Sequence, residues 1–473
     1  MFKHSIGFGL AISWLWLFYL QGPLLGPYSA LWQVDPSEPF HWFLCASWLT
    51  FLFLAKGIKI RSMFDKKHVL IVCAAILSLC PLLTAVLPRI MGNWTAANPY
   101  TLVVLAAISG VCSSPFLTAW MQTFILYDLR KLGLSFAVAI TISGLLTMAA
   151  GIVDSQWMLP TIILFPFASL FCLLSLIKLN PSQSQGEFPK TDAVNPFPAK
   201  LVSLIILFYL IGGTMFSIIS LEPIFSNVFY LSNASYVAAC LIAGAALYFK
   251  TNMDLQYLYR PVLPFLAIGF LLFSFHPVHF PMVSFLLLQG GLALFDMYTW
   301  LLFPYFARFS TRPAAVCAFG LFLTTASEFC GNLATPELTT MISGTLTGQG
   351  LALVGGALTV LSVLIFPNRK ETFAGWQTIL LPGKEAQSQA TDCDPPSDLP
   401  EVPQSLWKLP LTERENEVLS LLLKGRNSRF ISESLNISTN TVKFHTRNIY
   451  DKLTVNNRQE LLTRCESLDL SES

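Results

Sequence analysis

Two carboxylates lie inside long apolar stretches of this 473-residue chain, where the chemistry of an acid is most constrained. Asp296 lies near the centre of the apolar run 281–306, and Glu328 lies within the run 313–333. A charge inside a bilayer costs about 3 kcal/mol on insertion scales, so such a residue is a functional candidate by default. No Lys or Arg lies at matching depth. Each acid must therefore be protonated, hydrated in a cavity, hydrogen-bonded or paired with a ligand cation.

Asp296 and Glu328 are consequently the candidates for a ligand or proton site, and Tyr298 could supply an aromatic wall beside them. The alternative for both acids is an interhelical hydrogen bond that only holds helices together. Trp300 is a second candidate for this wall, and for both aromatic residues the alternative is packing in the core or against lipid. Three glutamines within or close to the apolar runs are possible polar neighbours of the acids: Gln21, Gln122 and Gln289.

A second group of chemically active side chains lies near the C-terminal end. In the predicted helix 439–453 the apolar residues recur on one stripe, whereas Lys443, Phe444 and Arg447 fall on another. Lys and Arg can donate hydrogen bonds to guanine O6 and N7, and Phe can touch a thymine methyl group. A basic stripe of this kind is also typical of a solvated helix face.

The composition indicates that a bilayer surrounds most of the chain. Hydrophobic residues make up 54% and charged residues only 12%, whereas soluble domains are about one quarter charged. Ten cysteines are present, none in a C-x-x-C pair, which argues against a disulfide framework and a zinc site. We see no nucleophile–base constellation and no P-loop, so we expect no enzyme, no metal and no cofactor.

The apolar runs predict about twelve transmembrane helices, because about 20 apolar residues in a helix cross the hydrocarbon. The first run is too long for a signal peptide and is expected to remain as a span. A more polar stretch, 180–200, separates two groups of six. The candidate spans lie near residues 7–29, 40–58, 69–88, 101–126, 134–153 and 157–178, and then near 201–220, 232–249, 261–276, 281–306, 313–333 and 345–366.

The loop charges predict the orientation of these spans. If Lys3 is cytoplasmic and the loops alternate, one side holds nearly all the basic loop residues and the other keeps only Arg89. Basic residues concentrate on the cytoplasmic side of membrane proteins, so we expect an inner-membrane protein with both termini cytoplasmic. The basic residues on that side are Lys3, Lys56, Lys59, Arg61, Lys66, Lys67, Arg130, Lys131, Lys178, Lys190, Lys200, Lys250, Arg260, Arg308, Arg312, Arg369 and Lys370.

Two groups of six spans around a longer cytoplasmic loop resemble the layout of the major facilitator superfamily. The sequence departs from that family in the loop between the second and third spans. This loop is basic around Arg61 and Lys66, but it lacks the family's G-x-x-x-D-R-x-G-R-R-like pattern. The resemblance implies a helix bundle, and fold analogy alone does not establish transport.

The C-terminal segment has the pattern of a soluble helical domain. Thr412 and Glu415 form a capping box at the start of the first helix. A short second helix, capped by Asn427 or Ser428, leads through a turn at 436–438 to the third helix, and a fourth opens near 457. A helix, a short helix, a tight turn and a long helix predict a helix-turn-helix.

The residues of this segment closely resemble the LuxR/GerE family of DNA-binding domains over about 60 positions. The resemblance implies that the third helix enters the major groove, with Lys443, Phe444 and Arg447 facing base edges, and that the domain binds DNA as a dimer. The matching residues are Leu411, Thr412, Arg414, Glu415, Glu417, Val418, Leu419, Gly425, Ile431, Leu435, Ile437, Ser438, Thr441, Val442, Lys443, His445, Ile449, Lys452, Leu453, Val455 and Arg458.

Other polar residues of the domain are expected at the DNA backbone, where contacts position a protein without reading sequence. These are Asn427, Arg429, Thr441 and Lys452, with Arg458 either joining them or holding the fourth helix.

The sequence as a whole predicts an all-α protein in three parts. Residues 1–370 form a polytopic transmembrane helix bundle, 371–405 form a flexible linker, and 406–467 form a four-helix LuxR-type domain. The expected function is that of a one-component transcription regulator that senses a small ligand and binds double-stranded DNA as a homodimer. The alternatives are a secondary transporter with an appended regulatory domain, and a bundle that only anchors that domain in the lipid bilayer.

Overall fold

The protein folds into two compact units, Met1–Asn368 and Arg369–Ser473. A computed structural model describes residues 2–17, 37–57, 62–91, 100–150, 155–179, 197–221, 225–249, 258, 260–275, 281–341, 347–365, 411–423, 426–435, 439–453, 455 and 460–461. The predicted linker 371–405 and most of the predicted fourth helix lie outside these residues.

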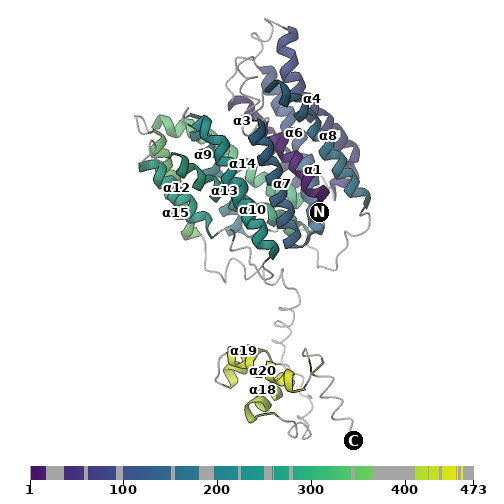
Figure 1. Cartoon of the computed structure of the whole chain (residues 1–473), viewed down its shortest axis with the longest axis vertical. Helices are drawn as coiled ribbons and strands as arrows, with labels where there is room; N and C mark the ends of the chain where they lie inside the picture. Colours follow the sequence, from purple (N-terminus) through teal and green to yellow (C-terminus); the bar gives the residue numbers. More distant parts are fainter. Residues whose placement is uncertain are drawn as a thin grey trace. The chain divides into compact units, whose positions relative to one another are not determined.

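The described part of the first unit contains twelve α-helices and a few short 3-10 or π segments, and each α-helix overlaps one predicted span (Figure 1). The all-α prediction of a bundle with six plus six helices is therefore confirmed. In chain order the helices are α1 (Phe2–Leu15), α3 (Ser37–Leu52), α4 (Lys67–Met91), α6 (Tyr100–Thr123), α7 (Leu129–Ala150), α8 (Ser155–Leu179), α9 (Ala199–Leu221), α10 (Phe225–Phe249), α12 (Val262–Phe275), α13 (Pro281–Ala307), α14 (Pro313–Met341) and α15 (Thr347–Ile365).

The two groups of six helices repeat the same packing. Within each half the first helix packs on the fifth (α1 on α7, α9 on α14) and the second on the fourth (α3 on α6, α10 on α13). The third helix packs on the sixth (α4 on α8, α12 on α15). Between the halves α3 packs on α14 and α7 on α10, so the second helix of each half meets the fifth of the other. The same six-helix packing therefore occurs twice in the described part of the chain, as expected of internal structural repeats.

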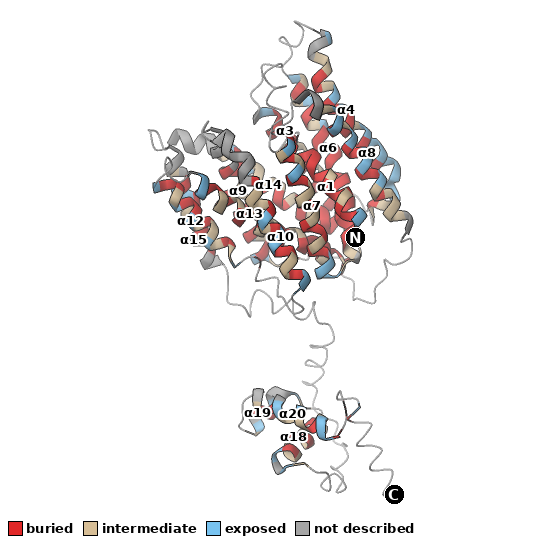
Figure 2. Cartoon of the chain, in the orientation of Figure 1, coloured by how far each residue is buried: buried red, intermediate tan, exposed pale blue. Residues whose placement is uncertain are grey.

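The outer surface of the bundle is apolar. Six stretches of helix in the described residues are long and apolar enough to cross a membrane, and three shorter apolar helices accompany them. The third and sixth helices of each half leave large apolar side chains exposed, while buried residues fill the interior (Figure 2). An exposed apolar surface of this extent needs lipid around it, so the chain is a multi-pass membrane protein. Examples are Ile71 and Leu79 of α4, Phe167 and Phe171 of α8, Ile268 and Leu271 of α12, and Val360 of α15.

Glycines allow the helix backbones to touch. A Cβ atom on Gly213 of α9 would lie 2.2 Å from the backbone oxygen of Glu328 on α14. Conversely, a Cβ atom on Gly331 of α14 would lie 2.2 Å from the backbone oxygen of Leu210. No side chain fits at either position, and small residues are what allows close helix approach in a bilayer. The reciprocal contact fixes where α14 lies along α9.

The second unit contains three described helices, α18 (Glu413–Leu423), α19 (Ser428–Ser434) and α20 (Thr439–Leu453). The predicted capping box is confirmed: the Glu415 amide donates to the Thr412 hydroxyl at 3.3 Å, and the Thr412 amide donates to Glu415 Oε2 at 2.8 Å. Asn427 caps α19 by accepting from the Phe430 amide at 2.8 Å. The three helices enclose a core of Val418, Leu419, Leu422, Ile431, Val442, Ile449, Leu453, Val455 and Leu461.

An ion pair joins the beginning of α18 to the end of α20. The Lys452 ammonium donates to Glu415 Oε2 at 2.6 Å, and the Glu415 side chain is only 4% exposed. The Lys452 ammonium and the Thr412 amide lower the pKa of Glu415 to about 2. A carboxyl whose pKa is lowered by folding stabilises the fold above its unfolded pKa of about 4.3, and this contribution is lost as the pH falls toward about 2.

The contact between α9 and α14 can be tested on adjacent glycines. We expect Gly213→Ala to lower the free energy of unfolding by about 1–3 kcal/mol, because the added methyl group overpacks a backbone contact. Gly212→Ala is the matched control, since its Cβ would meet only Leu292 at 3.7 Å, an ordinary contact. The measurement is the thermal unfolding midpoint of the detergent-solubilised protein. Equal midpoints for the two variants would contradict the packing described for Gly213.

The Glu415–Lys452 pair can be tested by hydrogen exchange in the full chain. Glu415→Gln should speed exchange of the α18 amides about tenfold at neutral pH, because a charge-assisted bond and a helix cap are weakened. The difference from wild type should shrink as the pH falls from about 5 to about 2, where the wild-type carboxylate is protonated. Glu417→Gln is the control, because Glu417 pairs with Arg414 at the surface. A pH-independent difference would speak against the ion pair.

Candidate functional site

A cavity of about 220 Å³ lies between the two halves of the bundle. The first, second, fourth and fifth helices of each half line it: α1, α3, α6 and α7 on one side, and α9, α10, α13 and α14 on the other. The third and sixth helices of each half contribute no described lining residue. The repeated packing of the halves therefore leaves a central site at the interface between them.

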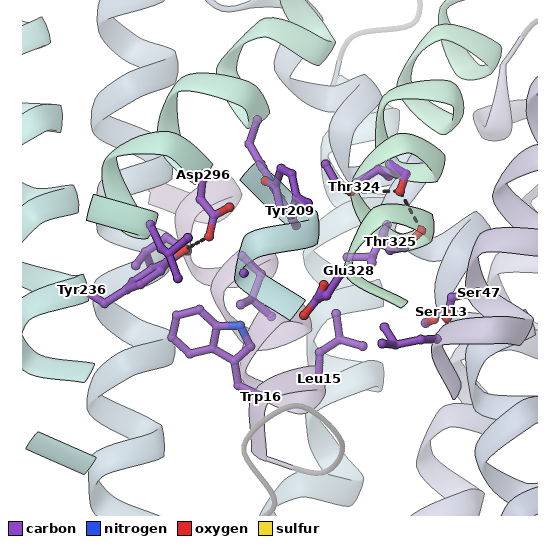
Figure 3. Close-up of a pocket in the computed structure, with 18 of the residues that line it drawn as sticks. Leu15, Trp16, Ser47, Ser113, Tyr209, Tyr236, Asp296, Thr324, Thr325 and Glu328 are labelled. Atoms are coloured by element: carbon purple, nitrogen blue, oxygen red, sulfur yellow. Dashed lines mark hydrogen bonds between the residues drawn. The ribbon is translucent and has the colours of Figure 1, made fainter. Parts of the chain in front are cut away.

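The two predicted acids lie in this one cavity. Asp296 of α13 and Glu328 of α14 both line it (Figure 3). The described lining residues include no Lys, Arg or His. The sequence predicted two acids without a basic partner at their depth, and in the structure both acids line one cavity without a described basic residue.

Asp296 is held by a tyrosine of a neighbouring helix. The Tyr236 hydroxyl of α10 donates to Asp296 Oδ2 at 2.5 Å (Figure 3). The indole of Trp16, the residue directly after α1, meets the Tyr236 ring in a T-shaped contact with centroids 5.4 Å apart. The acid, the tyrosine and the tryptophan therefore form one connected wall that reaches from the C-terminal half to the N-terminal half.

A second aromatic pair lies beside the acids. The Trp300 indole N–H donates to the Tyr209 hydroxyl at 3.1 Å, and that hydroxyl lies 3.0 Å from Thr299 Oγ1. Both rings line the cavity. Sequence analysis missed Tyr209, Tyr236 and Trp16, because aromatic residues are frequent in apolar runs and only the packing of the helices shows which ones face a site.

Glu328 differs from Asp296 in its partners. In the described part of the chain no hydrogen bond reaches its carboxylate, whereas its backbone oxygen accepts from Asn332 Nδ2 at 3.0 Å. The backbone is also fixed by the contact with Gly213. The structure therefore holds the main chain of Glu328 firmly and leaves its side chain facing the cavity.

The other residues considered near the acids have different positions. Tyr298 is 1% exposed, packs near Phe295 and is not among the residues that line the cavity. Gln289 does line it. Gln122 lies elsewhere and accepts from the Met63 amide at 2.8 Å, and Gln21 lies outside the described residues.

The halves are also joined at the end of the bundle where α6 and α13 finish. Arg308 Nε donates to the Ile125 carbonyl at 3.0 Å, and the same guanidinium donates to the Tyr127 carbonyl. The Tyr127 hydroxyl lies 2.6 Å from His4 Nδ1 near the N-terminus. One arginine of the C-terminal half thus holds the α6–α7 turn of the N-terminal half.

In the second unit, α20 presents polar and aromatic side chains away from its core. Val442 and Ile449 are fully buried, whereas Phe444 is 61% exposed and the Arg447 side chain is 84% exposed. Arg447 Nε lies 4.0 Å from an Asp451 carboxylate oxygen, a surface pair that is worth little in water. Lys443 belongs to the same helix, but its side chain lies outside the described part.

The residues predicted at the DNA backbone have mixed surroundings. Asn427 is exposed and uses its amide oxygen to cap α19. Thr441 is half-buried, and Lys452 is bonded to Glu415. The side chain of Arg429 and the whole of Arg458 lie outside the described residues. The phosphate contacts of these five residues stay a prediction.

Comparison with known proteins assigns the C-terminal unit. The sequence profile described as bacterial regulatory proteins, luxR family, matches residues 409–464. The chain is 39% identical over 69 residues to the HTH-type transcriptional regulator MalT of Vibrio campbellii, and equally to MalT of Klebsiella pneumoniae subsp. pneumoniae. The alignment covers 15% of this chain and 8% of each relative. The likeness therefore concerns the DNA-binding domain alone.

Comparison with solved structures assigns the fold of the bundle. The crystal structure of the human organic anion transporter MFSD10 (TETRAN) matches 77% of this chain and 97% of its own with a TM-score of 0.52. Its sequence is 13% identical, so the likeness shows the fold and not the activity. The chain therefore carries a LuxR-type helix-turn-helix domain at its C-terminal end, joined to a multi-pass membrane bundle with the fold of major facilitator transporters.

Proposed function

We propose that this protein is a one-component transcription regulator in which the membrane bundle binds a small molecule and the C-terminal domain binds promoter DNA. The observation that carries the proposal is that one chain contains both a LuxR-type DNA-binding domain and a central cavity with two acids. A ligand changes DNA binding only if it binds two states of the bundle with different affinity. A cavity lined by both halves meets that requirement, because any movement of the halves changes its walls.

The exposure of α20 supports its proposed role as the recognition helix. Phe444 and Arg447 project away from a fully packed core. A base edge can therefore reach both side chains. Arg447 and Lys443 suit guanine, and Phe444 suits a thymine methyl group. The phosphate contacts proposed for Asn427, Arg429, Thr441, Lys452 and Arg458 would fix the register of the domain. Dimers of helix-turn-helix domains bind two-fold sites, and we propose the same for this chain.

The proposed location is the cytoplasmic membrane with both termini in the cytoplasm. If the loops alternate, the sequence assigns the seventeen basic residues named above to one side of the twelve predicted spans and only Arg89 to the other, which is the distribution that the positive-inside rule describes. Lys56, Lys66 and Lys131 are exposed at helix ends on that side. The DNA-binding domain would then share a compartment with the chromosome.

Genome-wide DNA occupancy tests the regulatory function. Wild-type protein should give discrete peaks, and Lys443→Ala/Arg447→Ala should abolish them while membrane levels stay unchanged, because each lost base contact costs about 1–3 kcal/mol. Arg414→Ala is the control, because it removes a cation from α18 and not from the proposed recognition helix α20. The Arg414 guanidinium pairs with Glu417. Absence of wild-type peaks under every tested growth condition would contradict the proposal.

The second candidate function is secondary transport with a regulatory appendage, which the transporter fold of the bundle favours. In that case Asp296 and Glu328 would couple substrate to protons. Reconstituted wild-type protein would then accumulate a substrate in liposomes against its gradient, and Asp296→Asn would abolish this activity. We expect instead that the protein shows discrete DNA occupancy in cells and no accumulation of substrate in liposomes. Accumulation by the wild type that Asp296→Asn abolishes would establish the transporter.

A further inference from the structure

The cavity has different chemistry on its two sides. Every acid that lines it belongs to the C-terminal half, together with the amides Asn233 and Gln289. The N-terminal half contributes apolar side chains and two serines. Both serine hydroxyls donate within the protein: Ser47 to the Phe43 carbonyl at 2.7 Å and Ser113 to the Gly110 carbonyl at 3.0 Å. One wall is therefore acidic and polar, and the opposite wall is mainly apolar.

The acidic wall has no cation of its own. The described lining residues include no basic side chain, and the described groups that bond to Asp296 are the neutral hydroxyls of Tyr236 and Tyr209. A buried carboxylate is costly unless a counter-charge or hydrogen-bond donors satisfy it. A ligand cation that also carries N–H donors supplies both, and charge-assisted hydrogen bonds are about twice as strong as neutral ones.

Aromatic rings surround the same acids. Trp16, Tyr209, Tyr236 and Trp300 all line the cavity, and their mutual contacts fix the rings in place. The face of an indole or a phenol attracts a cation through its quadrupole, more strongly where water is excluded. Two carboxylates among four such rings are a combination that selects positive over neutral or negative groups.

We propose that the cavity binds an amphipathic organic cation: an amine or a related nitrogen cation against Asp296 and Glu328, with an apolar body against the N-terminal half. The proposal rests on the function proposed above and gives the ligand its chemical class. An apolar cavity of about 150 Å³ holds benzene, so the 220 Å³ site has room for one ring with a short aminoalkyl chain. Such a molecule touches both halves with different groups, and its affinity therefore depends on their separation.

Matched series of small molecules test this proposal on the purified full chain in lipid nanodiscs. Each series keeps one skeleton and changes the end group: phenethylamine, 2-phenylethanol and 3-phenylpropionate, and the corresponding amine, alcohol and acid of benzyl and cyclohexylmethyl skeletons. Titration calorimetry should show saturable binding of at least one amine, with its alcohol and acid at least about tenfold weaker. Failure of every amine to bind, or equal binding of an alcohol or acid, would overturn the proposal without relying on any variant.

Variants then locate the bound cation. Glu328→Gln and Asp296→Asn should each weaken the amine about tenfold and leave the alcohol unchanged. Glu38→Gln makes the same chemical change at an exposed residue of α3 outside the cavity and should alter neither. Unchanged amine affinity in both cavity variants would overturn the site.

The failure of this inference can be distinguished from the failure of the proposed function. Discrete DNA occupancy without amine selectivity would contradict only this inference, whereas the absence of all occupancy peaks would contradict the regulatory function itself.

Discussion

Close contact between helix backbones is the constraint on which the rest of the bundle depends. Lipid chains are as apolar as leucine side chains, so burial of apolar surface does not drive helices together in a bilayer, and packing must do so. The paired approach of Gly213 to the Glu328 carbonyl and of Gly331 to the Leu210 carbonyl fixes α14 against α9. Because the Glu328 backbone takes part in that contact, the same packing directs its side chain into the cavity.

The central site follows from repetition of one six-helix unit. Helices in corresponding positions of the two halves pack in the same way, and the halves meet through α3 with α14 and α7 with α10. This arrangement surrounds a cavity with eight helices, and the other four contribute no described lining residue and expose large apolar side chains. The halves remain linked away from the cavity through Arg308 and the turn at Tyr127. A molecule bound between them thus acts on an interface that already has defined polar contacts.

The sequence predicted the elements well because their signals are local. Twelve apolar runs became twelve helices, and the Thr412–Glu415 box and the Asn427 cap formed as their spacing indicates. The site needed information that the sequence lacks. Asp296 and Glu328 share a cavity because of the rotation of two helices about their axes, which apolar runs with little amphipathic pattern do not specify. For the same reason only one of the two aromatic residues expected at the site, Trp300, lines it, and Tyr236 and Tyr209 line it in place of Tyr298.

The contacts of Asp296 are compatible with a purely structural role, in which an acid only holds helices together, whereas those of Glu328 are not. Asp296 accepts a hydrogen bond from Tyr236 on the adjacent helix, which is what a structural role requires. Glu328 has no such partner among the described residues, and its helix is already fixed by backbone contacts that do not involve the carboxylate. Burial of an acid in the bilayer costs free energy, and no described contact of the Glu328 carboxyl offsets that cost. The proposed ligand binding would account for Glu328, and because Asp296 faces the same cavity, the bond from Tyr236 would then orient a binding group.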